Sequence, residues 1–123
     1  MLSGPTSLNN KQSQQLLSMV DRYLERHDKY VRKLAQKLLE SEHYDLVGTF
    51  LKYHDNDRLI GEIDVYGIRL RESQLDIYEV KGNRSGKYRS KGKEQLARAS
   101  DFLSPGFTTI NTYLYLAGKI EAP

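Results

Sequence analysis

Acidic and basic side chains stand at strand-like spacing between residues 61 and 81, in the segment GEIDVYGIRLRESQLDIYEVK. Side chains two apart on a β-strand point to the same face, so Glu62 and Asp64 are expected to share one face of a first strand. By the same spacing, Glu79 and Lys81 share one face of a second strand. If the strands pair, the carboxylates converge and repel each other, and a divalent cation relieves that repulsion. A lysine beside them can reach the attacking water or a phosphate. The segment therefore predicts metal-assisted hydrolysis of a phosphodiester.

The same residues have a simpler explanation, in which Asp64 or Glu79 forms an ion pair with Lys81 on an exposed sheet face. The match of three residue types to strand positions favours the hydrolytic site. Glu62 fits equally a further metal ligand and a solvated strand side chain.

Positive charge is concentrated directly after this segment. Between residues 81 and 98 there are seven Lys and Arg against one Glu, a local charge of +6 (seven minus one) in a chain of net charge +3. Such a stretch indicates a polyanionic partner, and an aromatic side chain within it can stack on an unpaired base. The alternative is a solvated basic loop. The side chains expected to contact nucleic acid are Arg84, Lys87, Tyr88, Arg89, Lys91, Lys93 and Arg98.

Length and composition limit the remaining possibilities. The 123 residues are expected to form one domain, 1–123, whose residues 1–7 are a loose segment with Gly and Pro. No apolar run approaches the ~20 residues of a transmembrane helix, and the polar N-terminus has no signal-peptide core. The chain has no cysteine. This excludes disulfides and thiolate chemistry, and it fits a cytoplasmic location.

The elements that must position these side chains follow from hydrophobic periodicity. A helical pattern runs from about residue 8 to residue 42, and we favour a break near His27, where Asp28 can cap a second helix. The order α-β-β-β-α-β predicts an α/β fold, a mixed sheet flanked by helices. The later elements are expected as strands at 43–52, 60–70 and 75–81 (the last one central), a flexible basic loop at 82–90, a helix at 91–103 and a strand or strand pair at 107–120.

Two kinds of apolar side chain alternate in the last strand. Tyr113 and Tyr115 lie on one face, and Leu114 and Leu116 on the other. In a chain this small, both faces can be covered, one by the core and the other by a second subunit.

The motif that carries a family resemblance is Asp64 followed, after fourteen intervening residues, by Glu79-Val80-Lys81. It resembles the PD-(D/E)XK nuclease superfamily. The words GEIDV and IYEVK are most similar to its small members, the archaeal-type Holliday junction resolvases and bacterial families with a GEID…EVK signature. Ile63 stands where the superfamily's name has Pro. The similarity covers about residues 30–103.

The resemblance implies a restriction-endonuclease-like core and a role for each motif residue. Asp64 and Glu79, with the backbone carbonyl of Val80, would bind Mg²⁺ or Mn²⁺. Lys81 would position or deprotonate the attacking water or stabilise charge on the phosphate. Gln95-Leu96 is similar to a pair that faces the site in RecB-like relatives, and a solvated Gln is the alternative.

Many relatives also place an acid on the helix before the first strand. Counting back from Tyr44, that position falls near Ala35, so no acid matches it. Glu42 extends the apolar stripe of the helix and is the nearest candidate for a metal ligand. His27 lies on the same stripe and is expected to be a core or interface residue rather than a ligand.

Together these features predict a divalent-metal-dependent endodeoxyribonuclease, structure-selective and most like a Holliday junction resolvase of DNA recombination and repair. The partner would be branched DNA. Because a four-way junction needs two symmetric cuts, the resemblance implies a homodimer. The alternatives are a nuclease for flaps, single strands or duplex, a non-catalytic nucleic-acid-binding protein with this fold, and a structural protein that assembles through its Tyr-rich strand.

Overall fold

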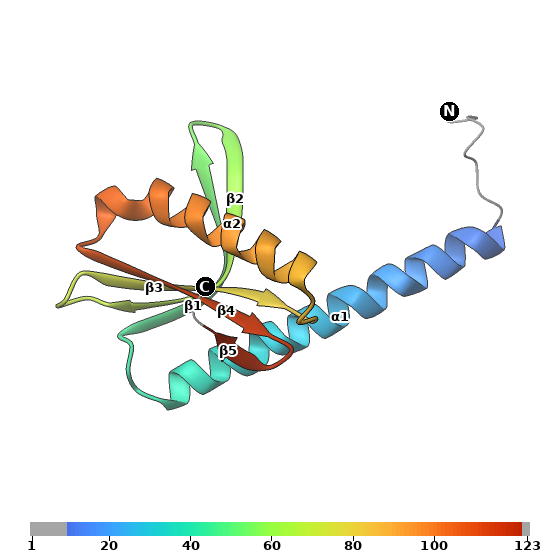
Figure 1. Cartoon of the computed structure of the whole chain (residues 1–123), viewed down its shortest axis with the longest axis horizontal. Coiled ribbons are helices and arrows are strands. Elements are labelled where there is room, and N and C mark those ends of the chain that lie inside the picture. The colour runs from blue at the N-terminus through green and yellow to red at the C-terminus, as the bar shows by residue number, and fades with distance from the viewer. Residues whose placement is uncertain (1–9, 122–123) are drawn as a thin grey trace.

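The computed structural model describes residues 10–121, so the segment 1–7 lies outside the described residues. One sheet of order β1-β2-β3-β4-β5 lies between two helices, with one helix packed on each face (Figure 1). The elements in chain order are α1 (Asn10–Glu40), β1 (Leu46–Asp55), β2 (Arg58–Arg69), β3 (Gln74–Lys81), α2 (Gly86–Leu103), the 3-10 turn η1 (Ser104–Gly106), β4 (Thr109–Leu116) and β5 (Lys119–Glu121).

The sheet is mixed, and this confirms the expected α/β class. β1, β2 and β3 form an antiparallel meander, and β4 pairs parallel to β3 after the crossover through α2. β5 closes the other edge, antiparallel to β4. β3 is the middle strand of five, as its apolar sequence predicts.

Helix α1 is unbroken, so the predicted break near His27 is wrong. The helix contains no Gly or Pro, and the Asp28 carboxylate lies 3.6 Å from His27 Nδ1 instead of capping a new helix. Its buried residues, Val31, Leu34 and Leu38, recur at three and four and pack on the sheet. N-terminal to them, the helix projects beyond the sheet (Figure 1). His27 therefore lies where α1 leaves the core.

Helix α2 begins at Gly86, so the expected loop at 82–90 is wrong in its second half. The Asn83 Oδ1 accepts a hydrogen bond from the Ser85 N–H at 2.7 Å. This turn leads the chain into the helix, whose first bond is donated by Arg89 N–H to the Ser85 carbonyl at 3.0 Å. The basic residues that follow Ser85 are thereby held on a helix.

Strand β4 is covered on both faces within one chain. Leu114 and Leu116 pack in the cluster under α2, whereas Tyr115 packs in the cluster under α1. Tyr113 stacks on Tyr78 with ring centroids 5.0 Å apart. The alternation predicted from the sequence is confirmed, and this strand needs no second subunit to cover it. Within residues 10–121, no helix has the length and apolarity to cross a membrane.

Candidate active site

The site forms where β2 separates from β3. Pairing between the two strands ends at Val65 and Tyr78, and the adjoining part of the β1–β2 hairpin turns away (Figure 1). The next residue on β2 is Asp64, whose Oδ2 accepts a hydrogen bond from the Val80 N–H at 2.9 Å. A side chain therefore takes the place of a strand partner and points a buried carboxylate into the gap.

The face alternation of β2 changes at Asp64. Ile63 packs in the cluster under α2 and Val65 in the cluster under α1, although residues two apart on a regular strand share a face. Opposite Asp64, Phe50 has a left-handed φ of 53°, and these two residues are unpaired although the register continues unshifted on both sides of them. The change of face therefore coincides with a local distortion at Phe50 and Asp64, and Glu62 does not follow Asp64 into the site. Glu62 is exposed and lies opposite Lys52 on β1.

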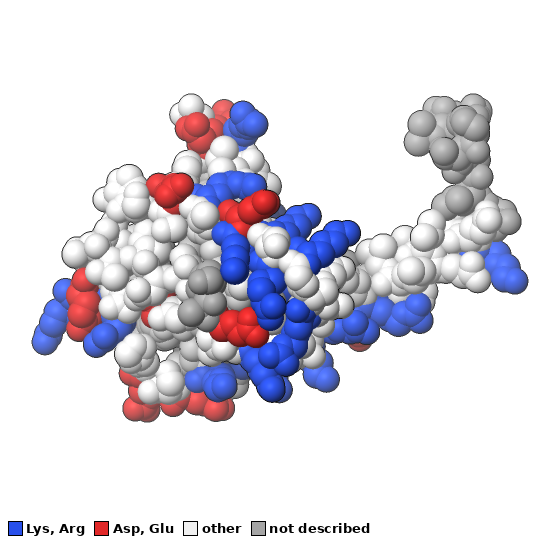
Figure 2. All heavy atoms as spheres, in the orientation of Figure 1, with Lys and Arg blue, Asp and Glu red and all other residues white. Residues whose placement is uncertain are grey.

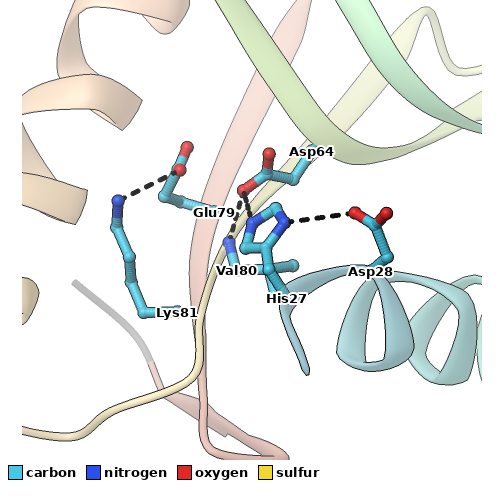
Figure 3. Close-up of polar contacts among 6 residues, drawn as sticks. All are labelled: His27, Asp28, Asp64, Glu79, Val80 and Lys81. Atoms are coloured by element: carbon cyan, nitrogen blue, oxygen red, sulfur yellow. Dashed lines mark hydrogen bonds and ion pairs between the residues drawn. The ribbon is translucent and has the colours of Figure 1, made fainter. Parts of the chain in front are cut away.

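Helix α1 contributes His27, whose Nε2 lies 3.4 Å from Asp64 Oδ2. Its Nδ1 lies 3.6 Å from Asp28 Oδ1, so the ring is held between two carboxylates (Figure 3). The hydrogen bond to Asp64 raises the pKa of His27, burial opposes it, and Asp28 adds to the rise.

Strand β3 contributes Glu79 and Lys81, which are 6% and 8% exposed. Lys81 Nζ reaches toward Glu79 Oε1 at 3.6 Å (Figure 3). Helix α2 lies close above them because residue 92 is glycine. A Cβ on Gly92 would lie 3.6 Å from Glu79 Cγ and only 2.6 Å from Leu114 Cδ2. The absence of a side chain at this position therefore sets the distance between the helix and the carboxylate.

The two carboxylates are electrostatically linked. Burial raises the pKa of Glu79, the charge of Asp64 raises it further, and Lys81 opposes the rise only in part, so that it reaches about 9. Burial also raises the pKa of Asp64, but hydrogen bonds with His27, Glu79 and the Val80 amide outweigh it and hold this pKa below its usual value. The opposite directions of the two shifts have one cause, because a second negative charge buried beside Asp64 is unfavourable.

The donor set fits a divalent cation, although residues 10–121 contain no ready-made group of three His, Cys, Asp or Glu ligands. Glu79 turns toward Lys81, while Asp64 turns toward Val80 and His27. A cation would relieve the repulsion between the two carboxylates. On α2, one turn after Gly92, Gln95 Oε1 is buried and has no hydrogen-bond partner in the described part of the chain. It is a free oxygen acceptor on the helix that covers Glu79.

The structure does not bring all predicted ligands to the site. Glu42 lies in the turn after α1, with a left-handed φ of 56°. The helix ends at Glu40, and its axis between His27 and that end spans about 20 Å. Glu42 is therefore at the wrong end of α1 to join Asp64. The contact of Val80 in the site is through its amide N–H.

Lys and Arg side chains gather around the beginning of α2 (Figure 2). Of the predicted nucleic-acid contacts, Arg84 and Arg89 form ion pairs with Glu121 of β5 at 3.3 and 3.0 Å. Tyr88 is half-buried. The remaining predicted contacts are exposed and belong to α2, namely Lys87, Lys91, Lys93 and Arg98.

Sequence reasoning missed the role of His27. The stripe that runs through Val31, Leu34 and Leu38 indicates a core position, and it does so correctly for those three. A signal was nevertheless present. His27 lies one helical turn before Val31, the first buried residue of the helix, and it is followed by Asp28. A histidine at the boundary of a core stripe faces both the core and the gap beyond it.

No protein-family model, curated protein or solved structure matches this chain. The resemblance to PD-(D/E)XK nucleases therefore depends on the motif residues alone.

Proposed function

We propose that the protein is a divalent-metal-dependent endonuclease that hydrolyses DNA phosphodiester bonds and has a restriction-endonuclease-like core. The observation that carries the proposal is the buried pair Asp64 and Glu79 with Lys81 beside it on the central strand. Two neighbouring buried carboxylates are unfavourable in a merely structural role. They suit a site that takes up a cation.

Asp64 and Glu79 would hold Mg²⁺ or Mn²⁺, with Gln95 Oε1 as a further donor and the Val80 carbonyl as the donor that the motif resemblance suggests. When bound, the cation would supply Lewis-acid neutralisation of the phosphodiester charge. Lys81 lies two residues from Glu79 and would stabilise the charge that develops on the phosphate. The hydrogen bonds of Val80 and His27 orient the Asp64 carboxylate.

DNA would reach this site along α2, which carries exposed lysines on both sides of its buried stripe. Lys87, Lys91 and Lys93 are exposed there, on the helix that covers Glu79. Contacts of this kind bind the backbone without reading the bases. The selectivity would therefore concern DNA structure, and branched DNA cut by a homodimer is the form that the motif resemblance favours. The lack of cysteine fits the cytoplasmic location that we propose with it.

One observation favours a second function, a non-catalytic nucleic-acid-binding protein. The described residues hold no complete ligand set, because Glu79 turns toward Lys81. This alternative predicts salt-sensitive DNA binding and no cleavage with Mg²⁺ or Mn²⁺ at any pH.

The substitution Glu79→Ala tests the proposal. It should abolish Mg²⁺-dependent cleavage and leave DNA binding nearly intact, because the side chain contacts the cation and not the basic surface. The matched control is Glu62→Ala, which removes an exposed carboxylate from the neighbouring strand and should cut like the wild type. Gels with four-way junction, flap, single strand and duplex give the substrate preference. Unchanged cutting by Glu79→Ala would show that the site is elsewhere.

A further inference from the structure

A pocket adjoins the carboxylate pair where α1 leaves the sheet. It lies between α1 and the connection from β3 to α2, and the residues that line it are Tyr23, Arg26, His27, Gly82, Asn83 and Tyr88. His27 belongs to both places, since its Nε2 lies 3.4 Å from Asp64 Oδ2. A group bound in the pocket would therefore be next to the proposed scissile phosphate.

Two tyrosines from different elements line this pocket. Tyr23 of α1 is 51% exposed and stacks on His27, with ring centroids 6.4 Å apart and planes at 13°. Tyr88 of α2 is half-buried. Burial raises the pKa of Tyr23, and Tyr88, Asp64 and Glu79 raise it further, which places its hydroxyl in the electrostatic reach of the carboxylate pair. A large exposed ring so close to the site is an available stacking surface.

Cations continue from the pocket along α1. Arg26 lies over Gly82, where a Cβ would approach its Cδ to 3.3 Å. The neighbouring hollow on the helix is lined by four cations and one acid, namely Arg22, Arg26, Lys29, Arg32 and Glu25. This basic surface is separate from the one on α2, and together they flank the pocket on two elements. Phosphates on either side of a bound base would meet positive charge on both.

We propose that this pocket binds one unpaired nucleobase, stacked on Tyr23 and Tyr88, while the neighbouring phosphate lies at Asp64 and Glu79. Stacking tolerates any base because every base has a π-face. A base inside a duplex has both faces covered by its neighbours and cannot enter. The proposal rests on the proposed function and deepens it: the substrate class is a strand with an unpaired nucleotide at the site of cleavage, as in a single strand, a flap or an opened branch point.

The test is a binding measurement that does not depend on cleavage. A single-stranded oligothymidine of about twelve nucleotides carries one 2-aminopurine, whose fluorescence falls when the base stacks. The measurement is made with the full chain in EDTA and repeated with Ca²⁺. Comparison with a uridine oligomer of the same design shows whether the pocket takes its base from DNA or from RNA. Quenching of either strand is expected, and quenching of neither overturns the proposal.

Variants separate stacking from general binding. Tyr23→Ala and Tyr88→Ala should each weaken single-strand binding about tenfold, and Tyr23→Phe should bind within about twofold of the wild type because the ring is kept. Duplex binding should change less than about twofold in all three. Leu24→Ala is the matched control, an exposed apolar residue on the same helix. Wild-type affinity in both alanine variants, or equal losses for single strand and duplex, would overturn the assignment.

The outcome for the pocket can be distinguished from the outcome for the nuclease. Quenching without Mg²⁺-dependent cutting supports the base pocket and rejects the nuclease. Cutting without quenching supports the nuclease and rejects the pocket.

Discussion

Strand β3 carries a buried carboxylate near each end, and the two differ in how they are satisfied. Asp76, near the start, is 2% exposed and accepts hydrogen bonds from Tyr44 OH at 2.5 Å, Gln74 Nε2 at 3.0 Å and Asn111 Nδ2 at 2.9 Å. Tyr44 OH is also bonded to Tyr78 OH at 2.7 Å. Neutral donors therefore complete this cluster.

At the other end of β3, Glu79 faces a second carboxylate. Asp64 has the Val80 amide and His27 as donors, whereas the Lys81 ammonium is 3.6 Å from Glu79, beyond the length of a good hydrogen bond. Burial of a carboxylate is therefore no sign of function by itself. Hydrogen bonds satisfy Asp76, and the pair at the other end still requires a positive charge.

The largest expected difference is in cleavage activity, between variants at the two ends of β3. Asp64→Asn should lower cleavage about 10³-fold or more, because it removes a charged ligand of the cation. Asp76→Asn should cut within about threefold of the wild type but lose about 1–3 kcal/mol of folding free energy, since an amide cannot accept all three hydrogen bonds. Single-turnover cleavage and urea unfolding measure the two quantities. Equal losses of cleavage in both variants would remove the distinction between the ends.

A smaller effect concerns stability and pH. Burial and Asp64 raise the pKa of Glu79 from 4.5 to about 9, so ionising it destabilises the folded state. In EDTA the free energy of unfolding should therefore fall by ~1 kcal/mol or more as the pH rises through this window. The raised pKa of His27 acts in the same direction, because the stability from its charged form is lost as pH rises. The pKa of Asp64 is lowered in the folded state. The stability that this shift contributes is fully present above the pKa of Asp64 in the unfolded chain, so it stays constant over this pH range.

Two controls identify Glu79 as the group whose ionisation makes the free energy of unfolding fall with pH. Glu79→Gln cannot ionise and should flatten most of it, and saturating Mg²⁺ should do the same in the wild type by binding the ionised pair. Urea unfolding at several pH values measures both. An identical slope in Glu79→Gln would assign the pH dependence to another group.

The smallest effect concerns the helix that covers the site. Gly92→Ala places a Cβ 2.6 Å from Leu114 Cδ2, so either the buried Leu114 side chain or α2 must shift. We expect a loss of about 1–2 kcal/mol in stability and a several-fold slower cleavage. Gly86→Ala is the matched control, because nothing lies within 4 Å of a Cβ there. If both variants cut equally fast, the close approach of α2 has no part in activity.

The sequence predicts the strands and the motif residues because both follow local rules. Alternation identifies β3 and β4, and the spacing of Asp64, Glu79 and Lys81 holds because they lie at the end of paired strands. The α/β class follows from the same pattern. Whether the fold is a restriction-endonuclease-like core is a question that only the motif addresses.

What the sequence does not predict depends on contacts between distant elements. The distortion at Phe50 and Asp64 coincides with the change of face that leaves Glu62 out of the site, and no local signal marks it. His27 meets Asp64 only because α1 crosses the gap between β2 and β3. The basic surface of α1 cannot be recognised in the sequence, because its segment carries charges of both signs. Only the helical geometry brings cations such as Arg22 and Arg26 together around one hollow.

The central claim is that the pair Asp64 and Glu79 takes up a divalent cation. The most direct test is a crystal structure with Mn²⁺, in which anomalous scattering locates the ion. We expect an anomalous peak that bridges the two carboxylates. The contrary result is a crystal at saturating Mn²⁺ with no peak there and the Glu79 carboxyl still turned toward Lys81.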